Sequence, residues 1–186
     1  MEQIERTMKS EKIYDGKLIS LRVETVELPD QKYSKREIVD HDPAVAILAA
    51  DEEDNIILIK QYRKAVDKTI YEIPAGCLEI GESPKEGAIR ELKEETGYTA
   101  QSIEYATEFF CSPGFCNEKI YVFIAKGIEK GEQKLDEDEF IECFKVPLEK
   151  AVKMIEVGEI MDGKTIVGIL MYKNLKGEDN NDDGFK

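Results

Sequence analysis

Short apolar runs separated by polar turns fill the first half of the chain, a pattern typical of β-strands. Asp15-Gly16 is a strong two-residue turn signal between the runs at 12–14 and 18–28, so these runs are expected to form a β-hairpin. Further strands are predicted at residues 36–39, 44–50, 56–62 and 71–73. The acidic segment 51–55 is expected to be the turn between two of them.

One helix is signalled at both of its ends. Ser83 suits the N-cap, Pro84 suits the first helical position, and Glu86 completes a capping box. Gly97 suits the C-terminal stop. After this helix, the pattern predicts strands at 103–109, 119–125 and 140–146. It predicts two final helices at 148–157 and 163–174.

This order of elements predicts an α/β fold with a mixed β-sheet and helices on both faces. Residues 1–40 are expected to form a small N-terminal β element, and residues 41–176 the main domain. Residues 177–186 are expected to be a polar, frayed tail.

Composition excludes several classes of protein. The 186 residues carry 26 Lys and Arg against 40 Asp and Glu, a net charge of −14, which disfavours binding to nucleic acid or to an anionic membrane. No apolar run approaches the roughly 18 residues of a membrane span, and the first residues lack the apolar core of a secretory signal. A cytoplasmic protein is therefore expected.

The residue types available as metal ligands favour oxygen donors over nitrogen or sulfur donors. The four cysteines form no C-x-x-C pair, and His41 is the single histidine, more simply an ordinary strand-end residue than a catalytic one. A metal in this protein should therefore be a hard cation held by carboxylates, which favours Mg²⁺ or Mn²⁺.

Carboxylates cluster on the predicted central helix. Glu91 and Glu95 are four residues apart and share one face, and Glu94 flanks it, so the three charges repel one another. Arg90 can pair with Glu94, and a divalent cation would reverse the repulsion. The plainer alternative is a solvated acidic surface.

Residues 76–98 resemble the signature of the Nudix hydrolase family. The positions that fit in register are Gly76, Glu82, Arg90, Glu91, Leu92, Glu94, Glu95 and Gly97. Tyr98 departs from the final aliphatic position. The resemblance implies a Nudix-type α/β/α sandwich that uses Mg²⁺, or Mn²⁺, to hydrolyse a nucleoside diphosphate linked to another group.

Segments outside the signature resemble the branch that cleaves ADP-ribose. They are Gln61-Tyr62-Arg63, Glu72 to Gly76, Ser112 to Glu118, and Asp162-x-Lys164-Thr165. The resemblance implies metal-dependent hydrolysis of ADP-ribose, or a related nucleotide sugar, to AMP and ribose 5-phosphate. The open alternatives are another nucleotide sugar, an oxidised nucleotide, or a non-catalytic module that binds ADP-ribose.

The same resemblance assigns site residues. It implies Glu137 as general base with Glu94 as a further catalytic candidate, and metal ligands at the Ala75 carbonyl, Glu91, Glu95 and Glu139. The implied substrate-binding residues are Arg36, Glu37, Arg63, Cys77, Ser112, Pro113, Gly114 and Glu118. It also suggests a homodimer in which the hairpin at 13–28 is exchanged, so the expected partners are a nucleotide-sugar substrate and a second copy of the chain.

Overall fold

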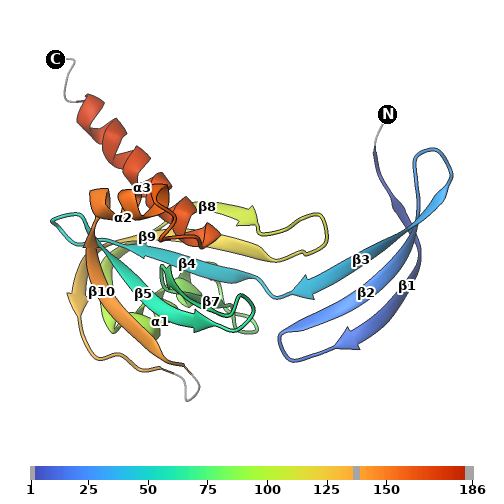
Figure 1. Ribbon diagram of the computed structural model, residues 1–186, viewed down its shortest axis with the longest axis horizontal. Helices are drawn as coiled ribbons and strands as arrows, with labels where there is room; N and C mark the ends of the chain where they lie inside the picture. The colour runs from blue at the N-terminus through green and yellow to red at the C-terminus, as the bar shows by residue number, and fades with distance from the viewer. Residues whose placement is uncertain (1–2, 136–138, 183–186) are drawn as a thin grey trace. The chain divides into compact units, whose positions relative to one another are not determined.

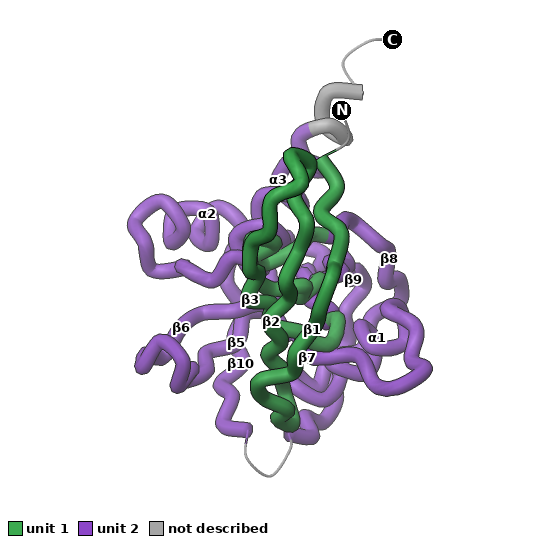
Figure 2. Tube along the Cα trace, turned by 90° about the vertical axis from the view of Figure 1, so that its right-hand side faces the viewer, with its two compact units in different colours: residues 1–43, 109–119 green, residues 44–108, 120–186 purple. Residues whose placement is uncertain are grey.

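The structure, a computed structural model, describes residues 3–135 and 139–182 (Figure 1). The chain forms two compact units, coloured separately in Figure 2. Unit 1 comprises residues 1–43 and 109–119, and unit 2 comprises residues 44–108 and 120–186. Within the described ranges, no helix is both long and apolar enough to cross a membrane.

Unit 1 is built on an antiparallel sheet of β1 (Arg6–Asp15), β2 (Ile19–Glu27) and β3 (Tyr33–His41), in that order. The predicted hairpin is present, but its turn is centred on Lys17 and Leu18 instead of Asp15-Gly16: Asp15 pairs with Ser20, and the Gly16 N–H donates to the Ile19 carbonyl at 3.0 Å. β1 begins six residues before the predicted run at 12–14, and every one of its ten residues is exposed. Backbone pairing with β2, rather than burial of an apolar face, therefore holds this strand, and the apolar pattern could not indicate its length.

The segment 111–118 is fastened to β3 by backbone and side-chain hydrogen bonds. The Val39 N–H donates to the Phe115 carbonyl at 2.7 Å, and the Val39 carbonyl accepts from the Asn117 N–H at 3.2 Å. The Asn117 side chain accepts from the His41 N–H and donates to Asp40. His41 is thus a strand-end residue, as the sequence predicts.

Unit 2 holds the remaining elements. Its helices are α1 (Pro84–Thr96), α2 (Leu148–Glu156) and α3 (Gly163–Asp182). The strands are β4 (Ala44–Ala49), β5 (Asn55–Arg63), β6 (Lys68–Glu72), β7 (Ala75–Cys77), β8 (Tyr98–Phe110), β9 (Lys119–Lys130) and β10 (Ile141–Pro147), and the ends of β8 and β9 extend into unit 1. One sheet has the order β7-β4-β9-β8 and the other β10-β5-β6. Because β4 runs parallel to β9 and antiparallel to β7, the larger sheet is mixed, as predicted.

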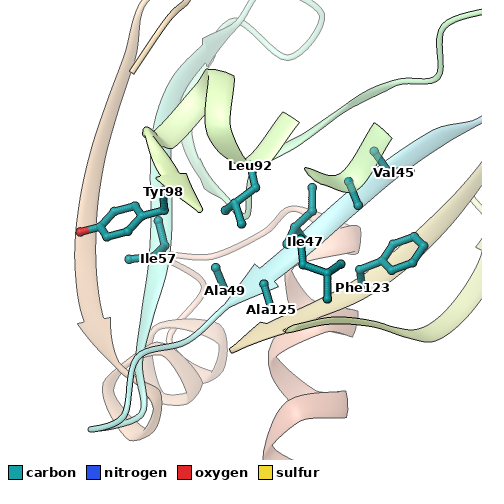
Figure 3. Packing of buried hydrophobic residues seen from close by; sticks show 10 residues of the cluster. Val45, Ile47, Ala49, Ile57, Leu92, Tyr98, Phe123 and Ala125 are labelled. Atoms are coloured by element: carbon teal, nitrogen blue, oxygen red, sulfur yellow. The ribbon is translucent and has the colours of Figure 1, made fainter. Parts of the chain in front are cut away.

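The core of unit 2 lies on both faces of β4. Ile47 and Ala49 pack in one cluster with Leu92 of α1 (Figure 3). On the opposite face, a methyl group added at Gly168 of α3 would lie 3.7 Å from Leu48. Since all six residues of β4 are buried, the strand reads as a continuous apolar run. The expected α/β architecture, with helices on both faces of a mixed sheet, is confirmed.

Several predicted boundaries are wrong, including the end of β9, which lies at Lys130, and the start of β6, which lies at Lys68; two others have a local cause. β8 begins at Tyr98, not at residue 103, because Gly97 adopts the left-handed φ of 74° that turns the chain straight into a strand. Tyr98 is buried in the core. The polar residues that follow it hide this start of the strand from the hydrophobic pattern of the sequence. α3 continues to Asp182 instead of ending at 174, since no proline follows to stop it.

The acidic turn between β4 and β5 makes the stability of the fold depend on pH. Asp51 is largely buried, which by itself raises its pKa, but hydrogen bonds from Lys145 and Asn55 outweigh burial and lower the pKa of Asp51 to about 2. A carboxyl group whose folded pKa lies below its unfolded value of about 3.9 stabilises the fold above that pH and loses this effect as the pH falls. We expect the gap in unfolding free energy between wild type and Asp51→Asn to be largest at neutral pH and to close between about pH 4 and pH 2.

Urea denaturation at a series of pH values measures this gap. Glu52→Gln, an exposed neighbour in the same turn, is the control and should show little pH-dependent difference from wild type. A constant difference for Asp51→Asn from pH 7 to pH 2 would contradict the role of the Asp51 charge.

Candidate functional site

Both ends of α1 are capped as the sequence predicts. The Ser83 hydroxyl accepts from the Glu86 N–H, and the Glu86 carboxylate accepts from the Ser83 N–H at 3.0 Å. The Gly97 N–H closes the other end by donating to the Lys93 carbonyl at 2.9 Å. These caps fix the length of the helix, so the faces on which Glu91, Glu94 and Glu95 lie are also fixed.

Arg90 gathers three glutamates around its guanidinium group. It donates two hydrogen bonds to Glu82, at 2.8 and 2.9 Å, and one each to Glu91 at 2.7 Å and Glu94 at 3.1 Å. A further hydrogen bond reaches the Cys77 carbonyl on β7 at 3.1 Å. The pairing with Glu82, followed by those with Glu91 and Glu94, raises the pKa of Arg90. One cation therefore holds the glutamates in place and offsets their repulsion.

Glu91 lies against the backbone of β7. A methyl group added at Gly76 would come within 2.0 to 2.5 Å of the Glu91 carboxyl atoms, so only glycine leaves room for this carboxylate. Burial, with the charges of Glu94 and Glu139 as smaller causes, raises the pKa of Glu91 despite the bond from Arg90. The absence of a side chain at Gly76 thus leaves the space that the Glu91 carboxylate occupies.

We expect Gly76→Ala to fold but to lose about 100-fold in kcat, because the new methyl group must displace the Glu91 carboxylate by about 1 Å or more. Stability should change little, because the clashing atoms are at the end of a flexible side chain. Steady-state kinetics with circular dichroism test this expectation. Gly163→Ala is the control, because nothing lies within 4 Å of a methyl group there. Unchanged turnover in Gly76→Ala would show that the position of Glu91 does not matter.

Glu95 is the most deeply buried carboxylate of the signature, with 3% of the residue exposed. Its carboxylate accepts a hydrogen bond from the Ala75 N–H at 2.8 Å. Burial raises the pKa of Glu95 to about 8, and the nearby charges of Glu91 and Glu139 add to the rise. One buried and one partly buried carboxylate with raised pKa values, on one helix face, form a site that favours a bound cation.

A second charged network adjoins this site and was not assigned from the sequence. Glu72, at the end of β6 and 1% exposed, accepts two hydrogen bonds from Arg63 at 2.7 and 2.9 Å, and it pairs with Lys164 at the start of α3. Burial alone would raise the pKa of Glu72, but the bonds from Arg63 and the charge of Lys164 leave it lowered. Asp162 accepts from Lys164 and from the Thr165 hydroxyl.

The signal for this network was present in the sequence. Glu72 and Lys164 both lie in segments that resemble the ADP-ribose branch, but they are 92 residues apart and nothing local indicates that they meet. Arg63, one of the predicted substrate-binding residues, therefore binds the carboxylate of Glu72 in this structure.

The donors present suit a hard divalent cation. Among the described residues, no three Asp, Glu, His or Cys side chains converge into a ready-made metal site. Glu91 is engaged by Arg90 and Glu95 by the Ala75 N–H. The oxygen donors, the burial of Glu95, the partial burial of Glu91 and the close approach at Gly76 nevertheless fit a cation that replaces part of these contacts.

Unit 1 brings together four of the predicted substrate residues. Arg36, Glu37, Pro113 and Gly114 line one pocket of about 460 Å³, whose walls include Phe115. Arg36 is paired with Glu5 through two hydrogen bonds, at 2.9 and 2.5 Å. The pocket therefore combines apolar walls with charged groups of both signs.

The other predicted residues are placed as follows. Ser112 accepts from the Phe115 and Cys116 N–H groups, which shapes the loop, and the Glu118 carboxylate lies 3.9 Å from His41. Glu94 pairs with Arg90 and keeps 43% of its side chain exposed. Glu137 lies outside the described residues. Glu139 is half-buried, and its charge acts on both Glu91 and Glu95.

Comparison with known proteins places the chain in a family. Residues 40–164 match the NUDIX domain, and residues 5–39 match the nucleoside diphosphate sugar hydrolase N-terminal domain. An ADP-ribose pyrophosphatase of Bacillus subtilis (strain 168) is 52% identical over 174 residues, covering 92% of this chain and 94% of the relative. A methanol dehydrogenase activator of Bacillus methanolicus is 46% identical over 167 residues, covering 89% and 90%.

The fold is also similar to that of a solved protein. A crystal structure of an ADP compounds hydrolase superposes with a TM-score of 0.85 at 22% identity, covering 95% of this chain and 96% of that one. The match to the NUDIX domain spans the signature at residues 76–98, in which Arg90 binds Glu82, Glu91 and Glu94. The chain therefore belongs to the Nudix hydrolase family.

Proposed function

We propose that the chain is a Mg²⁺-dependent pyrophosphatase that hydrolyses the diphosphate linkage of ADP-ribose, giving AMP and ribose 5-phosphate. The observation that carries the proposal is the pair formed by the partly buried Glu91 and the buried Glu95, held on one face of α1 beside Gly76. Nudix hydrolases generally use divalent metals. The name of the Bacillus subtilis relative supports ADP-ribose as the substrate.

The residues of the chain have distinct proposed roles. Glu91 and Glu95, with the Ala75 carbonyl, would hold the cation, which would neutralise diphosphate charge and make a water more acidic. Arg63 would bind a phosphate oxygen, since its guanidinium fork suits that geometry. Glu137 is proposed as the base, and Glu139 as a further ligand. The influence of the Glu139 charge on Glu91 and Glu95 supports placing Glu139 at the site.

A substrate panel tests the proposal. With Mg²⁺, the purified protein should release AMP from ADP-ribose faster than it cleaves other nucleoside diphosphate sugars, dinucleotides or nucleoside triphosphates, and chelation should stop the reaction. Glu137→Gln should lower kcat by about 100-fold or more if this residue is the base. Faster release from another nucleotide sugar would reassign the substrate within the same chemistry, and binding without turnover would favour the non-catalytic alternative.

A homodimer that exchanges the N-terminal hairpin is part of the proposal. Every residue of β1 is exposed, and a second copy of the chain would bury part of this surface. Supporting this, unit 1 exposes more than half of several apolar side chains: Ile4, Met8, Ile13, Tyr14 and Leu18. Light scattering at micromolar concentration should give twice the mass of the chain, and a monomer would refute the exchange.

A further inference from the structure

Gln61 carries a buried polar atom that the proposed site does not use. Its side-chain Oε1 is inaccessible to solvent and has no hydrogen-bond partner among the described residues. Buried acceptors are nearly always paired, because an unpaired one loses its hydration without compensation. The described part of the chain therefore supplies no donor for this oxygen.

The position of Gln61 on β5 directs its side chain toward α1. Side chains two residues apart on a strand lie on the same face, so Ile57, Ile59, Gln61 and Arg63 share one face. Ile57 packs in the core cluster with Leu92 of α1. The face that holds Gln61 is therefore the face toward the helix of the signature.

Residues on either side of Gln61 lie close enough to Glu95 to interact electrostatically with its charge. The charge of Glu95 acts on Arg63, two residues along β5, and on Cys143, which pairs with Ile59, two residues in the other direction. Across the sheet, Gln61 pairs with Ile141 of β10, two residues beyond Glu139. Gln61 thus lies between the groups that surround the Glu91–Glu95 pair.

The groups around this position leave the amide oxygen without a donor. Arg63 directs two of its N–H groups to Glu72, and no described residue donates to the Gln61 oxygen. An O–H group that arrives with a ligand, either a water held by a cation or a hydroxyl of the substrate, would supply the missing donor.

We propose that Gln61 is a positioning residue of the active site, whose amide oxygen accepts a hydrogen bond from a water on the divalent cation held by Glu91 and Glu95. A cation-held water is favoured over a sugar hydroxyl as the donor. The charge of Glu95, one of the proposed metal ligands, acts on residues on both sides of Gln61. The inference rests on the proposed metal site, and not on which nucleotide is cleaved.

The test compares Gln61→Leu, of similar volume but without polar atoms, with wild type. Mn²⁺ binding to the substrate-free protein is measured by electron paramagnetic resonance, and we expect the Kd to rise by about 10- to 100-fold. Melting of the chelated protein should stay equal or rise, because the substitution removes an unpaired buried acceptor. Gln61→Glu keeps an acceptor oxygen at the same reach, so it should bind Mn²⁺ within a few-fold of wild type. Gln101→Leu, an exposed glutamine of unit 2, is the matched control and should bind as wild type.

Other results would overturn the inference. An unchanged Mn²⁺ Kd in Gln61→Leu refutes it, and a higher KM for substrate with that unchanged Kd would assign the donor to a substrate hydroxyl instead. A lower melting temperature of chelated Gln61→Leu would show a structural role. Because the Mn²⁺ measurement needs no substrate, a wild-type protein that binds Mn²⁺ through Gln61 but does not cleave ADP-ribose would refute the proposed substrate and leave this inference standing.

Discussion

Replacing Glu95 with Gln is expected to lower kcat by about 10³-fold or more while the protein stays folded. A thousandfold loss corresponds to about 4 kcal/mol of transition-state stabilisation, and removal of a metal-binding carboxylate takes away both the cation and the charge that orients it. The fold should survive because the environment already disfavours the charge: burial raises the pKa of Glu95 to about 8. The Gln amide oxygen can still accept from the Ala75 N–H.

Turnover under saturating Mg²⁺ and melting of the chelated protein are the two measurements. Glu104→Gln, an exposed glutamate on β8, controls for the general loss of a negative charge and should leave both values unchanged. Melting of chelated Glu95→Gln several degrees below wild type would show that the carboxylate is structural. Full activity in Glu95→Gln would remove Glu95 from the metal site.

Replacing Glu72 with Gln should have the largest effect on stability, a loss of about 3 kcal/mol in the free energy of unfolding. The substitution keeps the shape of the side chain but leaves Lys164, with 12% of its side chain exposed, without its buried counter-charge. Arg63 loses its paired partner as well, so we also expect a higher KM for the diphosphate substrate.

Urea denaturation measures the loss directly. Glu142→Gln, an exposed glutamate on β10 of the same sheet, is the control and should fall within about 0.5 kcal/mol of wild type. The double variant Glu72→Gln/Lys164→Met should recover part of the loss, because it removes the uncompensated charge as well. Equal stability of the single and double variants would mean that the two side chains are not coupled.

The sequence predicts best those features that depend on local chemistry. The α1 caps, the hairpin and the pairing of Arg90 with Glu94 each involve residues within a few positions of one another, so spacing alone specifies them. The α/β class followed from the order of the elements. The predicted division into 1–40, 41–176 and 177–186 stays a prediction.

Features that depend on register or on distant pairing were out of reach. The contact between Glu72 and Lys164 requires β6 and the start of α3 to meet, and no periodicity encodes that meeting. The unpaired oxygen of Gln61 becomes visible only when the neighbours on β6 and β10 are known. The length of β1 is similarly hidden, because its side chains are exposed and its stability comes from the partner strand.

The burial of β4 on both faces has a consequence for hydrogen exchange. β4 is hydrogen-bonded to β7 along one edge and to β9 along the other, and none of its residues is exposed. Its amide protons should therefore exchange only through global unfolding and be the slowest in the protein. Because β7 carries Ala75 and Gly76, the backbone that holds Glu95 and Glu91 is anchored to this slowest-exchanging strand. Local opening elsewhere in unit 2 can then occur without disturbing the backbone against which Glu91 and Glu95 lie.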